Sequence, residues 1–191
     1  MRLEGTNLGK TDIGILKEVF EFNEISFSLT DLKNCVDILN NMSDIELKDS
    51  INLINPGISD ALNFCRDLGV TNSVLTGNTK ERALIKLGLN NLDSNFDLDL
   101  GFFGEIDFSR QQLVQNAKNY LSDLDNFEIV LIGDTPLDII SAKENQLKVI
   151  GVSSGSHSFT ELAKFNPDLL IHNFEENKTD FKNFIKELIR I

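Results

Sequence analysis

The stretch VLIGDTPLDIISAK, residues 130–143, predicts a short buried strand that turns directly into a helix. Two carboxylates, Asp134 and Asp138, lie four positions apart at this break. Open α/β sheets bind their ligands at the carboxyl ends of the strands. The stretch therefore predicts two acids at an edge where a ligand would bind.

The rest of the chain from residue 57 onward alternates in the same way. Apolar residues with helical spacing, or in short runs, mark successive helices and strands. The predicted helices cover 57–68, 79–89, 109–121, 136–145, 158–165 and 180–189, and the predicted strands cover 71–76, 96–100, 128–133, 147–152 and 168–171. This alternation is typical of a Rossmann-like, doubly wound parallel sheet that is covered by helices on both faces.

The N-terminal part breaks this alternation. Residues 10–23 and 28–50 have the spacing of two amphipathic helices without a strand between them, and Pro56-Gly57 marks a turn. We therefore expect a small helical segment over 1–55 and an α/β domain over 56–191. Parallel sheets usually begin with a central strand, so we also expect the first central strand to be missing.

Composition excludes several classes of protein. The chain has 191 residues, a net charge of −12 and dispersed Lys and Arg residues, which argues against nucleic acid and anionic membranes as partners. Two cysteines, Cys35 and Cys65, are too few for a disulfide framework or a zinc site. The N-terminus has no apolar signal region, and no apolar run approaches the length of a membrane span, so we expect a cytoplasmic protein.

The two acids suggest a metal site. Mg²⁺ is commonly held by one or two carboxylates, with water and phosphate oxygens as the other ligands. Gly133 favours this interpretation, because a glycine lets a ligand or another backbone approach closely. The alternative is structural, with Asp134 capping the helix and Asp138 interacting with the helix dipole.

A second strand end, in SVLTGNTKERA, suggests a phosphate site. Thr76 ends a strand, and Gly77-Asn78 lead into a helix whose N-terminal amides would bind an anion. The alternative is an ordinary N-cap at Asn78 or Thr79. A positive side chain is then expected, to hold the phosphoryl oxygens. Arg110, at a helix start, is better placed for this than Lys118, two turns later. The alternative for either residue is an ordinary surface cation.

Four stretches together resemble the haloacid dehalogenase superfamily, and especially its phosphoglycolate-phosphatase-like branch. They are LTGNTKERALIKLGL, FDLDLGFFGE followed by SR, LIGDTPLDIISAK, and VIGVSSGSHSFTEL followed by PDLLI. The resemblance runs from about residue 9 to 191, and residues 1–55 resemble part of the helical cap of that branch. It implies Mg²⁺-dependent hydrolysis of a small phosphate monoester, without identifying which metabolite.

The resemblance also implies site residues. Thr76, Gly77, Asn78 and Arg110 would bind the phosphoryl group, with Arg110 where the family usually has lysine. Asp134 would be the Mg²⁺ ligand and Asp138 its partner. Thr76, Arg110 and Asp134 would form the catalytic set.

The nucleophile is the missing part. The family's first motif is Asp-x-Asp-Gly-Thr, whose first aspartate forms the covalent intermediate, and no aspartate precedes Asp12. We therefore expect this chain to be inactive or nearly so, as an N-terminally truncated enzyme. The main alternative is a catalytically dead family member that acts as a binding or interaction module. A phospho-acceptor receiver module is a third.

Weaker candidates complete the set. Asp97, in NFDLDLG, resembles a nucleophile motif but follows polar residues instead of an apolar strand. His157 would lie near the rim of the site or be a solvated loop residue, and His172 would be a structural or surface residue. Lys10 and Asp12 would face the substrate or be plain cap residues.

The missing strand has a structural consequence. The strands ending at Thr76 and at Gly133 would either pair directly, leave backbone groups unpaired, or take up a strand from another chain. The gap is the reason to expect self-association.

Overall fold

The computed structural model describes residues 9–46, 54–105, 107–123 and 128–189. Its elements, in chain order, are α1 (Asp12–Phe22), α2 (Leu29–Glu46), α3 (Ile58–Asp67), β1 (Ser73–Thr76), α4 (Lys80–Leu89), the 3₁₀ turn η2 (Asp93–Asn95), β2 (Asp97–Phe103), α5 (Arg110–Ser122), β3 (Val130–Gly133), α6 (Pro136–Glu144), β4 (Lys148–Val152), α7 (Phe159–Ala163), β5 (Leu169–Ile171) and α8 (Lys178–Ile189). Every helix and strand predicted from the pattern is present, with ends that shift by a few residues; the last part of the helix predicted over 28–50 lies outside the described residues.

All pairs of neighbouring strands in the described residues are parallel. β1 pairs with β2, with Ser73 opposite Asp97 and Thr76 opposite Phe103, while β3, β4 and β5 form a second sheet in that order. The predicted mixed α/β class with parallel strands is confirmed. The described strands do not form one continuous sheet, because β1 and β3 are not hydrogen-bonded to each other.

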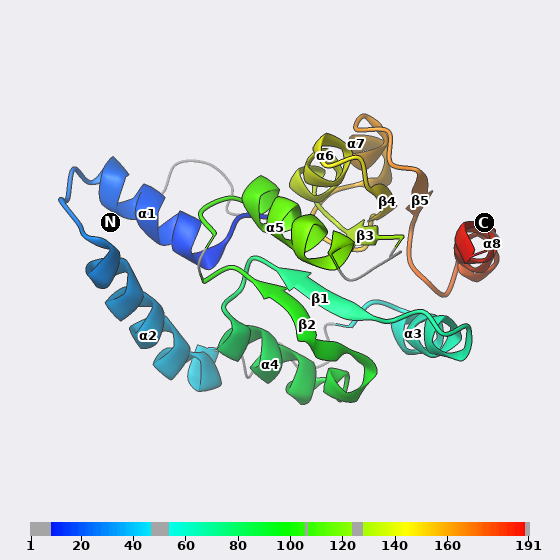
Figure 1. The fold of residues 1–191 in the computed structure, drawn as a ribbon, viewed down its shortest axis with the longest axis horizontal. Helices are drawn as coiled ribbons and strands as arrows, with labels where there is room; N and C mark the ends of the chain where they lie inside the picture. The colour runs from blue at the N-terminus through cyan, green and yellow to red at the C-terminus, as the bar shows by residue number, and fades with distance from the viewer. Residues whose placement is uncertain (1–8, 47–53, 106, 124–127, 190–191) are drawn as a thin grey trace.

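Helices cover both faces of the three-stranded sheet, as the alternation predicts (Figure 1). Successive residues of β4 point to opposite faces: Val149 packs with Ile139 and Leu162, whereas Ile150 packs with residues of the α3 and α8 side such as Phe181. These side chains are completely or almost completely buried. Burial on both faces explains why the strands are continuous apolar runs.

The two N-terminal helices lie together at one end of the molecule, opposite α3 and α8 (Figure 1). α1 packs on α2, and α2 packs on α4 of the α/β part. Leu32 and Val36 supply the buried side of α2. No described helix has both the length and the apolar character that a membrane span requires.

Candidate functional site

The turn between β3 and α6 is built by a capping box. Thr135 is the N-cap residue of α6; its hydroxyl accepts a hydrogen bond from the Asp138 N–H, and the Asp138 carboxylate accepts from the Thr135 N–H at 3.0 Å. Gly133 is needed here, because a Cβ on it would collide with the Asp138 side chain. Thr135, and not Asp134, therefore caps this helix, and Asp138 completes the capping box from the first turn.

Asp138 is also half of a buried ion pair. Its Oδ1 lies 2.6 Å from Nη2 of Arg110, and both side chains are more than nine-tenths buried. The same Nη2 donates to the Leu75 carbonyl oxygen at 3.2 Å. Arg110 thus links β1 to the start of α6, across the place where β1 and β3 are not paired.

Asp134 has a different environment. Its side chain is exposed on one side, while its carboxylate lies directly against Gly155 in the loop after β4. Partial burial of the carboxyl group, followed by the nearby Asp138 charge, raises the pKa of Asp134 above its ordinary value; His157 and Arg110 oppose this rise. A bound cation would relieve the repulsion between the two carboxylates.

The turn between β1 and α4 has its amides already engaged. The Asn78 N–H donates to the Thr76 hydroxyl oxygen at 3.2 Å, and the Thr79 N–H donates to Asp12 Oδ2 at 2.9 Å. The Lys80 N–H donates to Glu105 Oε2 at 2.8 Å. Thr79 is the N-cap residue of α4. The helix start that was predicted to hold a phosphate thus holds two of the chain's own carboxylates.

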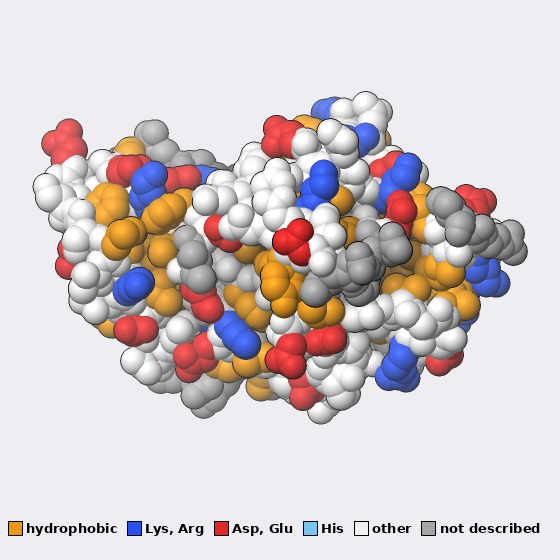
Figure 2. Space-filling view, in the orientation of Figure 1, with side chains coloured by type: hydrophobic (Ala, Val, Ile, Leu, Met, Phe, Trp, Pro, Cys, Tyr) orange, Lys and Arg blue, Asp and Glu red, His pale blue; other side chains and the backbone are white. Residues whose placement is uncertain are grey.

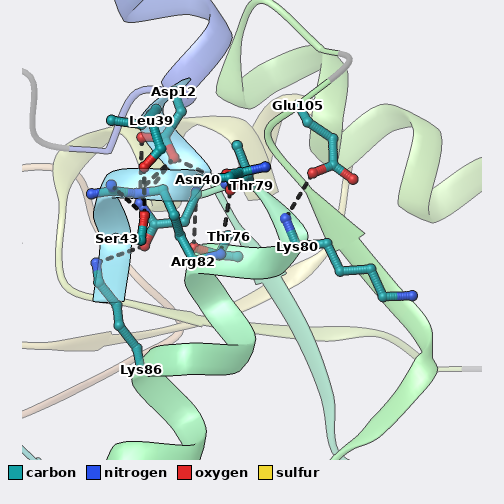
Figure 3. Close-up of polar contacts among 11 residues, drawn as sticks. Asp12, Leu39, Asn40, Ser43, Thr76, Thr79, Lys80, Arg82, Lys86 and Glu105 are labelled. Atoms are coloured by element: carbon teal, nitrogen blue, oxygen red, sulfur yellow. Dashed lines mark hydrogen bonds and ion pairs between the residues drawn. The ribbon is translucent and has the colours of Figure 1, made fainter. Parts of the chain in front are cut away.

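Around this turn lies a polar cluster of Asp12, Asn40, Ser43, Thr79 and Arg82, which we call the α4 cluster (Figure 3). The Arg82 Nε lies 3.5 Å from Asp12 Oδ2, and its Nη1 donates to the Ser43 hydroxyl at 3.0 Å. The Thr79 hydroxyl donates to Asn40 Oδ1 at 2.6 Å. The cluster joins the N-terminal helices to the α/β part.

Sequence reasoning missed Arg82, Asn40 and Ser43. One signal was available: Arg82 is a cation in the first turn of a helix, where the helix dipole favours anions. A cation at such a position indicates a nearby carboxylate, and Asp12 supplies it. Asn40 and Ser43 carried no comparable signal, since polar residues on an amphipathic helix are usually solvated.

Residues 9–12 lie against the carboxyl ends of both β1 and β3. The Asp12 N–H donates to the Gly77 carbonyl oxygen at 2.6 Å, just after β1. A Cβ on Gly9 would lie 2.5 Å from Thr135 Oγ1, just after β3. Thr76, Arg110 and Asp134 therefore lie around one edge of the fold, where the first residues of the described chain cross it.

Two rival candidates lie elsewhere. Lys118 donates to the Asn145 carbonyl oxygen at 2.7 Å, at the far end of α6, so Arg110 is the cation nearer the site. Asp97 is the first residue of β2, opposite Ser73. It is therefore at the amino end of its strand, whereas Thr76 is at the carboxyl end of the neighbouring strand.

The remaining candidates have local roles. His157 is close enough to Asp134 to lower the pKa of that carboxyl. His172 stacks on Phe159, with ring centroids 4.6 Å apart. Lys10 pairs with Glu18 at 2.6 Å and does not point into the α4 cluster.

A metal site at this edge would rest on few carboxylates. No group of three or more His, Cys, Asp or Glu side chains arranged to hold a metal occurs in the described ranges. Asp138 is engaged by Thr135 and Arg110, which leaves Asp134 as the exposed carboxylate. One carboxylate with water and phosphate oxygens is still within the usual coordination of Mg²⁺.

Comparison with known proteins identifies the family. The model described as haloacid dehalogenase-like hydrolase matches residues 8–152. A curated relative, the probable phosphatase IndB of Dickeya dadantii (strain 3937), is 28% identical over 133 residues, which make up 65% of this chain and 54% of the relative. The chain thus aligns with only about half the length of this relative.

Solved structures agree on the fold. A HAD hydrolase of family IA, variant 3, from Entamoeba histolytica HM-1:IMSS has a TM-score of 0.69 at 18% identity, covering 92% of this chain and 78% of that one. A predicted phosphatase from Clostridium acetobutylicum has a TM-score of 0.65 at 19% identity, covering 97% and 84%. At these identities the likeness concerns the fold alone.

Proposed function

The chain belongs to the haloacid dehalogenase-like hydrolases, and from this premise we propose that its site is that of a Mg²⁺-dependent phosphatase of small phosphate monoesters, in a chain that itself has little or no turnover. Thr76, Gly77, Asn78 and Arg110 would bind the phosphoryl group. Asp134 would hold Mg²⁺, with Asp138 acting on it through charge and through Arg110. The catalytic set would be Thr76, Arg110 and Asp134.

One observation carries this proposal: Thr76, Arg110 and Asp134 come from three separate units, and Arg110 contacts residues next to the other two. Arg110 joins them, because it contacts Leu75 beside Thr76 and also Asp138 beside Asp134. A fixed cation there suits the charge that develops on phosphoryl oxygens during transfer. Mg²⁺, when bound, would neutralise further phosphoryl charge.

The proposed lack of turnover rests on the residues that precede the described part. Residues 2–6 are Arg-Leu-Glu-Gly-Thr, which have the spacing of the family's Asp-x-Asp-Gly-Thr motif. If these residues are matched to the motif one by one, Arg2 would stand at the nucleophilic aspartate and Glu4 at the acid–base aspartate. The first motif would then be altered, in contrast to the expectation that it is missing. An arginine cannot form the covalent phosphoryl intermediate, because its guanidinium stays protonated.

Hydrolysis of p-nitrophenyl phosphate, with Mg²⁺ and with a chelator, tests this function. We expect no Mg²⁺-dependent turnover by the chain, and weaker Mg²⁺ binding in Asp134→Asn. The double variant Arg2→Asp, Glu4→Asp restores the two aspartates and is expected to gain turnover that Asp134→Asn abolishes.

The outcomes separate clearly. Metal-dependent turnover by the unaltered chain would contradict the proposed inactivity, and Asp97 would be the first nucleophile to test. Unchanged Mg²⁺ binding in Asp134→Asn would contradict the metal site.

A second candidate, a catalytically dead member that binds a partner, is supported by the surface of the N-terminal helices. Phe22, Ile25, Leu29, Ile38 and Met42 are each 43–65% exposed. Figure 2 shows hydrophobic side chains gathered over α1 and α2. Ile38 and Met42 are four positions apart and share one face of α2, and neighbouring exposed apolar residues are typical of an interaction surface. Under this function, Asp134→Asn would leave partner binding unchanged, whereas Ile38→Ser would weaken it.

We further propose that residues 1–55 act as a partial cap over the domain of residues 56–191, with a small phosphorylated metabolite between them and no nucleic acid or membrane partner. Self-association through the edges of β1 and β3 that no described strand pairs with belongs to the same proposal. Sedimentation of the chain at increasing concentration tests it, since a monomer at all concentrations would contradict self-association.

A further inference from the structure

The first turn of α4 is held by the chain's own carboxylates. Helix N-terminal amides are ready-made anion sites. Here the Thr79 amide donates to Asp12 and the Lys80 amide donates to Glu105 (Figure 3). Asp12 therefore already occupies part of the surface that an incoming anion would need.

Asp12 is also close to the residues proposed for phosphate. Both of its carboxylate oxygens lie 3.4 Å from the Asn78 side-chain nitrogen, and its own N–H donates to the Gly77 carbonyl oxygen. Its side chain is only 11% exposed, so solvent screens its charge weakly. A phosphate at Thr76–Asn78 would thus be placed beside a negative charge.

We propose that Asp12 is an internal competitor for this anion site, so that phosphate binding and docking of the α1–α2 segment oppose each other. The inference rests on the proposed phosphate site. The competition has two parts: Asp12 takes up hydrogen-bond donors of the β1–α4 turn, and its charge repels the phosphate.

The geometry links this competition to the helical segment. Thr79 bonds Asp12 with its N–H and Asn40 with its hydroxyl; Arg82 contacts Asp12 with Nε and Ser43 with Nη1. Thr79, the N-cap residue of α4, and Arg82 therefore hold both the start of α1 and the C-terminal half of α2. An anion that displaces Asp12 loosens this attachment, and by reciprocity a loosened attachment favours the anion.

Isothermal titration of inorganic phosphate into four chains tests the inference. Asp12→Asn removes the charge but keeps an oxygen that can accept from the Thr79 amide, and Asp12→Ala removes both. Asp37→Asn is the matched control, because Asp37 is an exposed carboxylate on α2. We expect phosphate to bind about fivefold or more tightly to Asp12→Asn, and at least as tightly to Asp12→Ala, while Asp37→Asn matches the unaltered chain.

Hydrogen exchange of α2 gives a second readout. In the unaltered chain, phosphate is expected to speed exchange in residues 29–46, and Asp12→Ala is expected to speed it without phosphate. Equal phosphate affinities for Asp12→Asn and Asp37→Asn, or slower exchange of α2 with phosphate, would overturn the inference.

A fifth variant separates this failure from failure of the proposed function. Thr76→Val should weaken phosphate binding if the phosphate site is correct. Weaker binding in Thr76→Val, together with no effect of Asp12→Asn, would overturn the competition and leave the site intact. No phosphate binding by any variant would overturn both.

Discussion

Asp134 and Asp138 belong to one short motif but have opposite environments. Asp138 is buried and its two oxygens contact Thr135 and Arg110, whereas Asp134 is exposed on one side and repelled by Asp138. The difference follows from the capping box, because the first turn of α6 folds Asp138 back over the strand end. Asp134 is left as the carboxylate that a ligand can reach.

This contrast predicts a stabilising variant, Asp134→Asn. The folded-state pKa of Asp134 is raised above its ordinary value of 3.8, so the ionised carboxylate disfavours the folded state once the pH rises through the folded pKa. Removing the charge should stabilise the protein at pH 7 by less than about 1 kcal/mol, because solvent screens a partly exposed group. The gain should disappear as the pH falls towards 4.

Thermal unfolding between about pH 4 and pH 8 measures this effect. Asp37→Asn serves as the control, since it removes an exposed carboxylate elsewhere. A melting temperature of Asp134→Asn at or below that of the unaltered chain at pH 7 would contradict the prediction.

At the scale of elements, Arg110 holds together parts that the sheets leave separate. It is the first residue of α5, and its guanidinium contacts the Leu75 carbonyl oxygen of β1 and the Asp138 carboxylate of α6. A buried ion pair of this kind is worth little relative to apolar residues, but breaking it leaves a buried charge without a partner. The junction between β1 and α6 therefore depends on both partners being present.

We predict that Arg110→Met lowers the free energy of unfolding by about 3–5 kcal/mol. Asp138→Asn should also destabilise the protein, and the double variant should lose less than the sum of the single variants, because the two side chains interact directly. Urea denaturation of the three variants gives the coupling energy.

The exposed pair of Lys148 and Asp168, 3.0 Å apart, is the matched control. Lys148→Met should cost less than about 1 kcal/mol. Additive effects of Arg110→Met and Asp138→Asn would show that the buried pair does not couple the two elements.

At the scale of the whole molecule, the chain combines a parallel α/β fold with a strongly acidic composition. It has 30 acidic and 18 basic residues, a net charge of −12. Two ion pairs that hold distant segments together, Asp12 with Arg82 and Asp138 with Arg110, are largely buried. The repulsion between acidic side chains on the surface is therefore more sensitive to salt than these buried ion pairs are.

We predict that NaCl stabilises the protein. Raising the ionic strength from about 10 mM to about 100 mM shortens the Debye length from about 30 Å to about 10 Å. The resulting loss of repulsion should raise the melting temperature by roughly 2–4 °C, equivalent to about 1 kcal/mol. MgCl₂ at the same ionic strength is the control, and any additional rise with it measures specific metal binding. A melting temperature that falls with NaCl would contradict the prediction.

Periodicity and turn residues in the sequence alone predicted the helices, the parallel strands and the edge where the candidate site lies. These features depend on neighbours a few residues apart, and the Thr135-x-x-Asp138 spacing of the capping box was equally local. The partners of the charged groups were not predictable in this way. Asp12 and Thr79 are 67 residues apart, and Arg110 and Leu75 are 35 apart. Only the tertiary structure decided that Asp138 is held by Arg110 and that Asp12 occupies the start of α4, because such contacts depend on how whole elements pack and not on the pattern within any one of them.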